Sequence, residues 1–204
     1  MFKKPIIVFE GIEGSGKSHH INNVSKYLKK RNIKFIRIRE PGGCKNSEKI
    51  RKLILDNKST FNKNTDLLLY MSSRSENIEL IQNNIGKKII LIDRFIDSTI
   101  AYQHYGMGVN IKLIKTLNNF LLKDIKVSFT FINTVNQKNM KKRLDSRKKL
   151  NRYDKFNSNF YKKVQEGFIK IYKQSPKKYM KVDSNLNIIH NQKIILDKID
   201  ILIK

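Results

Sequence analysis

Residues 11–18 read GIEGSGKS and directly follow the apolar run IIVF at residues 6–9. The spacing G-x-x-x-x-G-K-[ST] is typical of a phosphate-binding loop, in which backbone N–H groups surround phosphate oxygens. Its glycines let the backbone approach the phosphate, and the N-terminus of the following helix favours anions. Because the loop lies between a predicted strand and a predicted helix, we interpret it as a nucleotide site. Lys17 is expected to reach the phosphates and Ser18 to ligate Mg²⁺.

Five short apolar runs alternate with longer amphipathic stretches along the chain. The runs are β-branched and bounded by charged or turn residues, as buried parallel strands are. This alternation predicts an α/β fold with a central parallel five-stranded sheet flanked by helices. The predicted strands are 6–9, 33–38, 89–92, 127–132 and 179–182, and the predicted helices are 17–30, 66–84, 110–122 and 156–172. At 204 residues, we expect a single domain over residues 1–204.

The residues that follow each strand are the first site candidates, because ligands of such sheets bind beyond the carboxyl ends of the strands. Arg39 and the turn sequence EPGG follow the second strand, and Asp93 and Arg94 follow the third. Asp93 resembles the Mg²⁺-associated carboxylate of phosphate-loop folds, and a salt-bridged strand end is the alternative. Arg94 suits a second phosphate group, because a guanidinium binds phosphate oxygens in a bidentate fork.

Two further features have more than one interpretation. Tyr70 and Arg74 lie four residues apart on a predicted helix, so they share a face that could hold a nucleobase. The alternative is a core tyrosine beside a surface arginine. Residues 141–152 form the densest basic patch of the chain. This patch could contact nucleic acid, form a solvated helix, or be a mobile lid whose arginines close over phosphates and exclude water.

Three sequence blocks together resemble the thymidylate kinase family, and the resemblance spans nearly the whole chain. They are FEGIEGSGKS at residues 9–18, REPGG at 39–43 and DRFIDSTIAYQ at 93–103. REPGG is far more specific to this family than the phosphate loop, and other phosphate-loop nucleotide kinases do not combine all three blocks. The resemblance implies the nucleoside monophosphate kinase fold. It also implies phosphorylation of dTMP to dTDP with Mg²⁺ and ATP, by direct in-line transfer.

The resemblance further implies roles for individual residues of this chain. The catalytic set is Lys17, Asp93, Arg94 and Arg147, and Ser18 and Asp93 would hold the metal. The residues implied to bind ATP are Gly11, Ile12, Glu13, Gly14, Ser15, Gly16, Lys17 and Ser18. The residues implied to bind dTMP are Glu10, Arg39, Tyr70, Arg74, Arg94, Thr99, Tyr102 and Gln103. In this set Tyr70 would stack on thymine, Arg74 would hydrogen-bond the base and Thr99 would read the pyrimidine edge. Tyr102 would disfavour a ribose 2′-hydroxyl.

The positions of the arginines indicate the bacterial type of this family. Some members carry a catalytic arginine in the phosphate loop, at the position where this chain has Glu13. Members of the bacterial type supply arginines from a lid instead. Arg143, Arg147 and Arg152, in a lid segment at residues 143–155, fit that arrangement. Four residues depart from the family pattern, and these are His19, Cys44, Met107 and Asn133.

Composition sets limits on location and partners. The net charge is +26, from 43 Lys and Arg against 17 Asp and Glu. Such a charge makes nucleic acid a candidate partner. The lysines, however, are scattered rather than gathered in one tail, which favours the alternative that a Lys- and Asn-rich surface is a compositional habit of the organism. A single cysteine, Cys44, excludes an intrachain disulfide and favours a reducing compartment. No apolar run approaches the about 20 residues of a membrane helix.

We therefore expect a cytoplasmic protein without a membrane segment that binds ATP and dTMP. Because family members are usually homodimers, a homodimer is expected, together with weak non-specific contact to nucleic acid. Two alternatives remain at this stage. One is another phosphate-loop nucleotide kinase, and the other is a nucleic-acid-binding protein on a degenerate kinase fold.

Overall fold

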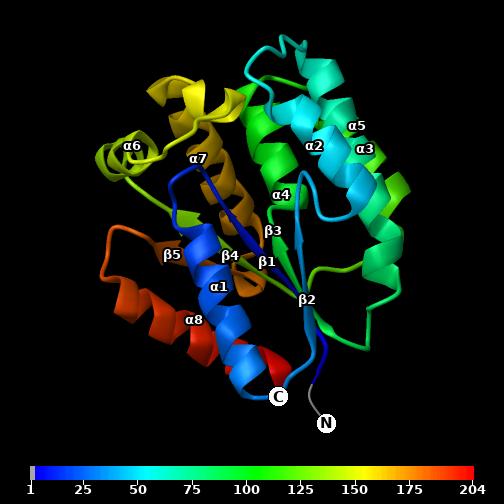
Figure 1. Ribbon diagram of the computed structural model, residues 1–204, viewed down its shortest axis with the longest axis vertical. Helices are drawn as coiled ribbons and strands as arrows, with labels where there is room; N and C mark the ends of the chain where they lie inside the picture. Colours follow the sequence, from blue (N-terminus) through cyan, green and yellow to red (C-terminus); the bar gives the residue numbers. More distant parts are fainter. Residues whose placement is uncertain (1–2) are drawn as a thin grey trace.

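The protein is built on a parallel five-stranded sheet with helices on both faces (Figure 1). A computed structural model describes residues 3–204. The strand order is β2-β3-β1-β4-β5, and every neighbouring pair is parallel. The strands are β1 (Ile6–Gly11), β2 (Phe35–Arg39), β3 (Ile89–Asp93), β4 (Phe129–Thr134) and β5 (Tyr179–Asp183). The predicted α/β fold is confirmed, and each strand begins and ends within two residues of its predicted bounds.

Alternate residues of the strands face two different layers of helices. Ile7 and Phe9 of β1 pack with α1 (Lys17–Lys30) and α8 (Ile188–Ile203) on one face of the sheet. Ile6 and Val8 pack with α3 (Lys63–Gln82) and α5 (Ile111–Leu122) on the other face. This two-residue period explains why the strands read as continuous apolar runs, since both faces of the sheet are covered. The helix α7 (Ser158–Gln174) completes the second layer.

The remaining elements are short and lie mainly around the carboxyl ends of the strands. They are α2 (Lys45–Leu55), α4 (Ile96–Thr99), the π-helix η1 (Ile100–Gly106), α6 (Gln137–Asp145), and the 3₁₀-helices η2 (Arg152–Lys155) and η3 (Pro176–Lys178). The helices α2, α6 and α8 were not predicted from the sequence, although their signals are present. Asn136 and Asn187 cap α6 and α8, because each side-chain oxygen accepts hydrogen bonds from the first turn.

The lid segment (residues 143–155) lies at the same end of the molecule as the carboxyl ends of the strands (Figure 1). It links α6 through η2 to α7, and it contacts the end of α2: the Asn57 amide donates to the Leu150 carbonyl at 2.9 Å. Within residues 3–204, no helix is both long enough and apolar enough to cross a bilayer.

Candidate active site

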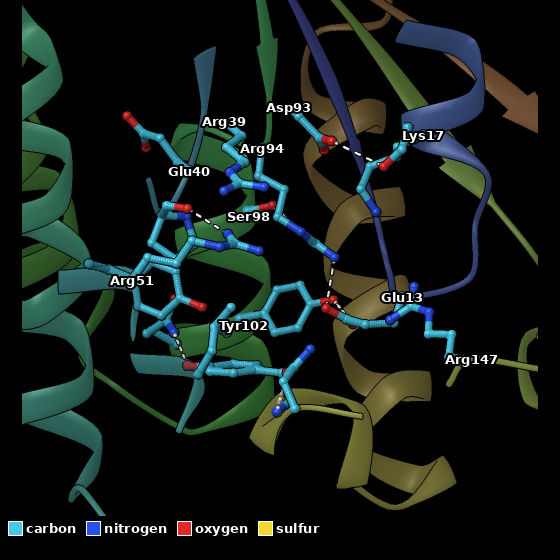
Figure 2. Close-up of a pocket in the computed structure, with 17 residues that line it drawn as sticks. Glu13, Lys17, Arg39, Glu40, Arg51, Asp93, Arg94, Ser98, Tyr102 and Arg147 are labelled. Atoms are coloured by element: carbon cyan, nitrogen blue, oxygen red, sulfur yellow. Dashed lines mark hydrogen bonds and ion pairs between the residues drawn. The ribbon is translucent and has the colours of Figure 1, made fainter. Parts of the chain in front are cut away.

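A pocket of about 210 Å³ opens where β1, β2 and β3 end (Figure 2). Its walls come from the loops after these three strands and from α2, α3, η1 and the lid segment. Segments far apart in the sequence therefore meet there, as expected for the carboxyl edge of a parallel sheet. The predicted site residues that line it are Glu13, Lys17, Ser18, Arg39, Tyr70, Asp93, Arg94, Tyr102, Gln103 and Arg147.

The phosphate loop turns sharply between β1 and α1. Gly11 has φ +137°, and a Cβ there would lie 2.2 Å from the carbonyl oxygen of Asn133 on β4. Only glycine fits both this conformation and this close approach. The Lys17 ammonium donates to the Gly11 and Ile12 carbonyls at 2.9 and 2.8 Å. Burial, followed by the Arg94 charge, lowers the pKa of Lys17 to about 7, so this side chain changes charge near neutral pH.

Ser18 and Asp93 lie next to each other at the N-terminus of α1. The Ser18 hydroxyl donates to the Asp93 carboxylate at 3.3 Å, although the two residues lie 75 positions apart in the sequence. A hydroxyl and a carboxylate are oxygen donors of the kind that Mg²⁺ prefers, and this ion commonly takes few protein ligands and keeps several waters. The two predicted metal ligands are therefore placed where one Mg²⁺ beside the phosphate loop could contact both.

Arg94 is held in an uncommon backbone conformation. Its φ is +67°, in the left-handed region that non-glycine residues rarely adopt. The turn is fixed by Glu10, whose buried carboxylate accepts the backbone N–H groups of Phe95 and Ser98 at 2.8 and 3.1 Å. Burial raises the pKa of Glu10, and these hydrogen bonds oppose that rise. Glu10 does not line the pocket; it supports the turn that directs Arg94 into it.

Arg94 and Tyr102 both point toward Glu13 of the phosphate loop (Figure 2). The Arg94 guanidinium donates to the Glu13 carboxylate at 2.8 Å, and the Tyr102 hydroxyl donates to its other oxygen. Arg94 also lies over the Tyr102 ring, with 5.1 Å between the guanidinium carbon and the ring centroid. The structure thus brings an anion-binding arginine and an aromatic ring to the phosphate loop itself.

The side of the pocket away from the phosphate loop is lined by aromatic rings and a side-chain amide. Tyr70 of α3 and Tyr153 of η2 meet edge to face, with ring centroids 5.8 Å apart. Tyr102 and Gln103 come from η1, a seven-residue π-helix. π-Helical turns are rare in proteins, and those that occur are often found at functional sites. The Gln103 amide donates to the Tyr153 hydroxyl at 3.3 Å. Such a wall suits a flat polar ring that stacks on one side and hydrogen-bonds at its edge.

Arg74 lies behind this wall rather than on it. The side chain is 1% exposed and forms an ion pair with Glu40 at 2.7 Å. It also donates to the side-chain oxygens of Asn118 and Thr99, at 2.5 and 3.1 Å. Neither Arg74 nor Thr99 lines the pocket, and the contacts of the Arg74 guanidinium are with neighbouring side chains. Arg39 does line it and forms a two-bond fork with Glu48 at 3.0 and 2.8 Å.

The three lid arginines occupy three different places. Only Arg147 lines the pocket, and it is ion-paired with Asp154 at 2.5 Å. Arg143 lies against the phosphate loop, where it donates to the carbonyls of Gly14 and Ser184 at 2.8 and 2.7 Å. Arg152 points to α3 and pairs with Asp66. Arg147, the one lid arginine included in the implied catalytic set, is therefore also the one of the three that lines the pocket.

Three charged or aromatic residues of this region were missed by the sequence analysis. Arg51 and Tyr153 line the pocket, and Glu40 lines it while pairing with Arg74. Arg51 lies on α2 and donates to the Pro41 carbonyl at 2.5 Å, next to the cis peptide bond between Glu40 and Pro41. It could have been found from the helix that follows REPGG, because Glu48 and Arg51 are three apart and share a face.

The departures from the family pattern cause no visible break in the site. Cys44 is the N-cap of α2, and its Sγ accepts from the Ser47 backbone N–H at 3.5 Å. The Asn133 amide donates to the Glu10 carbonyl at 3.2 Å. Met107 packs among the apolar side chains behind η1. His19 is exposed and lies within 2.9 Å of the Gln192 amide.

Comparison with known proteins identifies the family. A family model described as thymidylate kinase matches residues 9–195. The thymidylate kinase of Kosmotoga olearia is 35% identical over 190 residues, which is 91% of each chain. That of Mycoplasma capricolum is 37% identical over 202 residues, 95% of each. The crystal structure of thymidylate kinase from Ehrlichia chaffeensis matches with a TM-score of 0.79 at 30% identity, covering 97% of this chain and 99% of that one. The chain therefore belongs to the thymidylate kinase family, whose activity is the ATP-dependent phosphorylation of dTMP.

Proposed function

We propose that this protein phosphorylates dTMP to dTDP, with the γ-phosphoryl group of Mg²⁺-bound ATP passing directly to the acceptor phosphate. The observation that carries the proposal is the pocket in which Arg94 faces the phosphate loop and aromatic rings lie beyond it. This arrangement supports two anionic nucleotides bound head to head at one edge of the sheet. We call the wall formed by Tyr70, Tyr102, Gln103 and Tyr153 the acceptor side.

On the phosphate-loop side, the backbone N–H groups of residues 11–18 and the Lys17 ammonium hold the phosphates of ATP. Ser18 and Asp93 hold Mg²⁺, as their 3.3 Å contact supports. When bound, the metal supplies positive charge that neutralises the phosphate oxygens. Lys17 must be protonated for this task, and a bound phosphate next to it favours the protonated form.

On the acceptor side, the Arg94 guanidinium holds the dTMP phosphate, because that guanidinium already binds an anionic oxygen of Glu13. Tyr70 stacks on the thymine ring, and the Gln103 amide offers hydrogen bonds to its edge. The Tyr102 ring lies against the sugar. Arg74 keeps this wall in place through Glu40, Asn118 and Thr99.

Transfer itself depends on positioning and charge. The acceptor is already a phosphate anion, so no strong general base is required. Negative charge spreads over the equatorial oxygens as the γ-phosphoryl group moves, and Arg147 meets it. The position of Arg147 in the pocket lining supports this role. The lid segment excludes water, so the phosphoryl group reaches dTMP and not solvent.

The adenine of ATP is proposed to occupy a second pocket of about 230 Å³ beside α1. Gly16, His19, Arg143, Ser184 and Leu186 are among its lining residues. The Arg143 guanidinium, anchored on two carbonyls, offers a flat cationic surface to the base. Burial, with His19 nearby, lowers the pKa of His20 to about 4, so this ring is neutral beneath the phosphate loop.

The proposed partners beyond the substrates are a second copy of the chain and, weakly, nucleic acid. Leu68 of α3 and Leu113 and Phe120 of α5 are exposed, and the Phe120 side chain is 73% accessible. Because α3 and α5 are neighbours, these residues supply an apolar surface suited to a homodimer. The net charge of +26 supports salt-dependent contact with nucleic acid. The single cysteine supports a reducing compartment and hence the proposed cytoplasmic location.

The experiment that tests the function is a coupled ADP-release assay with dTMP, dUMP, UMP and CMP as acceptors. We expect dTMP to be the preferred acceptor, with direct detection of dTDP as product. Preference for UMP or CMP would overturn the substrate assignment. ATP turnover absent with every acceptor, together with salt-sensitive DNA or RNA binding, would support the nucleic-acid-binding alternative.

A further inference from the structure

One buried carboxylate on α3 joins the lid segment to the acceptor side of the pocket. Asp66 is 1% exposed, and each of its oxygens is used. One oxygen accepts from the Arg152 guanidinium, and the other from the Tyr153 hydroxyl. The Gln103 amide lies 3.5 Å from this second oxygen. Asp66 therefore holds two consecutive lid residues against the wall that carries Gln103.

The same short stretch of the lid holds Arg147 on its other side. Asp154 accepts from the Arg147 guanidinium at 2.5 Å and from the Asn151 backbone N–H at 3.0 Å. The Tyr161 hydroxyl of α7 donates to the Tyr153 carbonyl, which ties residues 151–154 to α7 as well. Residues 151–154 are thus tied to α3 through Asp66 and to Arg147 through Asp154.

Arg147 needs this support because little else restrains it. Its side chain is 40% exposed and lies in the pocket through its pairing with Asp154. A long exposed side chain samples many rotamers unless a partner directs it. The Asp66 contacts, by contrast, are charge-assisted and screened from water. Asp66 therefore holds residues 151–154 more tightly than those residues hold Arg147.

We propose that Asp66 is a positioning residue that latches residues 151–154 to the acceptor side and thereby sets Arg147 over the transferring phosphate. The inference rests on the proposed function. It adds that lid closure is governed from the acceptor side, since Asp66 contacts Gln103 and Tyr153 and no residue of the phosphate loop. Arg152 then acts as an anchor of the lid and not as a phosphate ligand.

The kinetic test is a double-mutant cycle between Asp66→Asn and Arg147→Met. The first change removes the charge with little change in shape, and the second removes the guanidinium. We expect Arg147→Met to lower kcat by about 100-fold and Asp66→Asn by about tenfold, with the KM for ATP nearly unchanged. If Asp66 acts through Arg147, the double variant falls no more than about threefold below Arg147→Met alone. Glu79→Gln, an exposed charge change on the same helix, is the matched control and should leave kcat unchanged.

A second readout is independent of activity. Trypsin can cut the lid after Arg147, Lys148, Lys149 and Arg152. We expect Asp66→Asn to speed cleavage at these sites by about tenfold, with other sites unaffected, because cleavage follows the population of the open segment. The proposal would be overturned if the effects of Asp66→Asn and Arg147→Met on kcat multiplied in the double variant. It would also be overturned if trypsin cleaved the lid of Asp66→Asn no faster than that of the wild type. If Asp66→Asn does not fold, Tyr153→Phe removes one of its two lid contacts and is judged by the same two criteria. Wild-type protein that shows lid protection but no dTDP formation would instead count against the proposed function.

Discussion

The phosphate-loop side and the acceptor side of the pocket are built in different ways. On the phosphate-loop side, one continuous stretch at residues 11–18 supplies backbone N–H groups, an ammonium and a hydroxyl. On the acceptor side, residues from α3, η1 and η2 are brought together, and buried carboxylates hold them there. The carboxylates are Glu40, which pairs with Arg74 behind the wall, and Asp66, which contacts Tyr153 and Gln103. The phosphate loop is built from local contacts and therefore tolerates substitutions elsewhere in the chain. The acceptor side is built from distant segments, so its structure depends on each buried charge keeping its partner.

The sharpest way to test this contrast is to remove the arginine that lies between the two sides. We expect Arg94→Gln to lower kcat/KM for dTMP by about 10³-fold, because a neutral amide cannot replace a charged fork on a phosphate. The KM for ATP should change little. The measurement is steady-state kinetics with each substrate varied, beside a melting curve to confirm folding. Arg37→Gln is the control, since Arg37 is exposed on β2, its guanidinium donates to the Asn22 side chain at 2.7 Å, and it does not line the pocket. Activity within tenfold of the wild type would contradict this role for Arg94.

The second test compares the buried ion pair behind the acceptor side with an exposed ion pair elsewhere in the pocket wall. Glu40→Gln leaves the Arg74 guanidinium, 1% exposed, without its countercharge. Breaking such a pair costs about 3–5 kcal/mol of unfolding free energy, and the melting temperature should fall by about 10 °C or more.

Its control is Glu48→Gln. The Arg39 partner of Glu48 is 54% exposed, so we expect less than about 1 kcal/mol for this change. Chemical denaturation of both variants in the same buffer measures the two losses of unfolding free energy. Equal losses for the two variants would mean that burial of the carboxylates is not what holds the acceptor side together.

The same contrast explains what could be predicted from the sequence. The phosphate loop, REPGG and Asp93-Arg94 were found because each follows a strand directly, where neighbours in sequence are neighbours in space. The supporting roles of Arg74 and Arg152 could not be read in this way. Their partners, Glu40 and Asp66, lie 34 and 86 positions away. A sequence motif states which side chain is present, but only the fold decides whether it faces the pocket or a buried carboxylate.

The third prediction concerns the phosphate-loop side and follows from the pKa of Lys17, which burial lowers to about 7. Above pH 7 the free protein holds Lys17 neutral, whereas a bound diphosphate raises its pKa and requires the ammonium. Binding therefore takes up a proton, and the Kd for ADP should rise with pH. We expect it to weaken by about eightfold between pH 7.5 and 8.5. Calorimetry in two buffers of different ionisation enthalpy measures both the affinity and the proton uptake.

Lys17→Arg is the control for this titration, because arginine keeps its charge throughout the range. Its affinity for ADP should be flat between the same two pH values, whatever its absolute strength. The terminal phosphate of ADP titrates near pH 6, below the window, so it contributes little to the slope. A flat profile for the wild type would show that Lys17 stays protonated before nucleotide binds.

The smallest expected effect concerns the cap of α2, the helix that carries Arg51 to the pocket. Cys44 caps this helix through sulfur, a weak acceptor, at 3.5 Å from the Ser47 N–H. Cys44→Ser places a stronger acceptor at the same position, and good N-caps contribute about 0.5–2 kcal/mol over poor ones. We therefore expect a gain of about 0.5–1 kcal/mol and a rise in melting temperature of about 2 °C. Cys44→Ala removes the acceptor without supplying another and should lower the melting temperature instead. If serine and alanine gave the same stability, the side-chain cap would contribute nothing to the stability of α2.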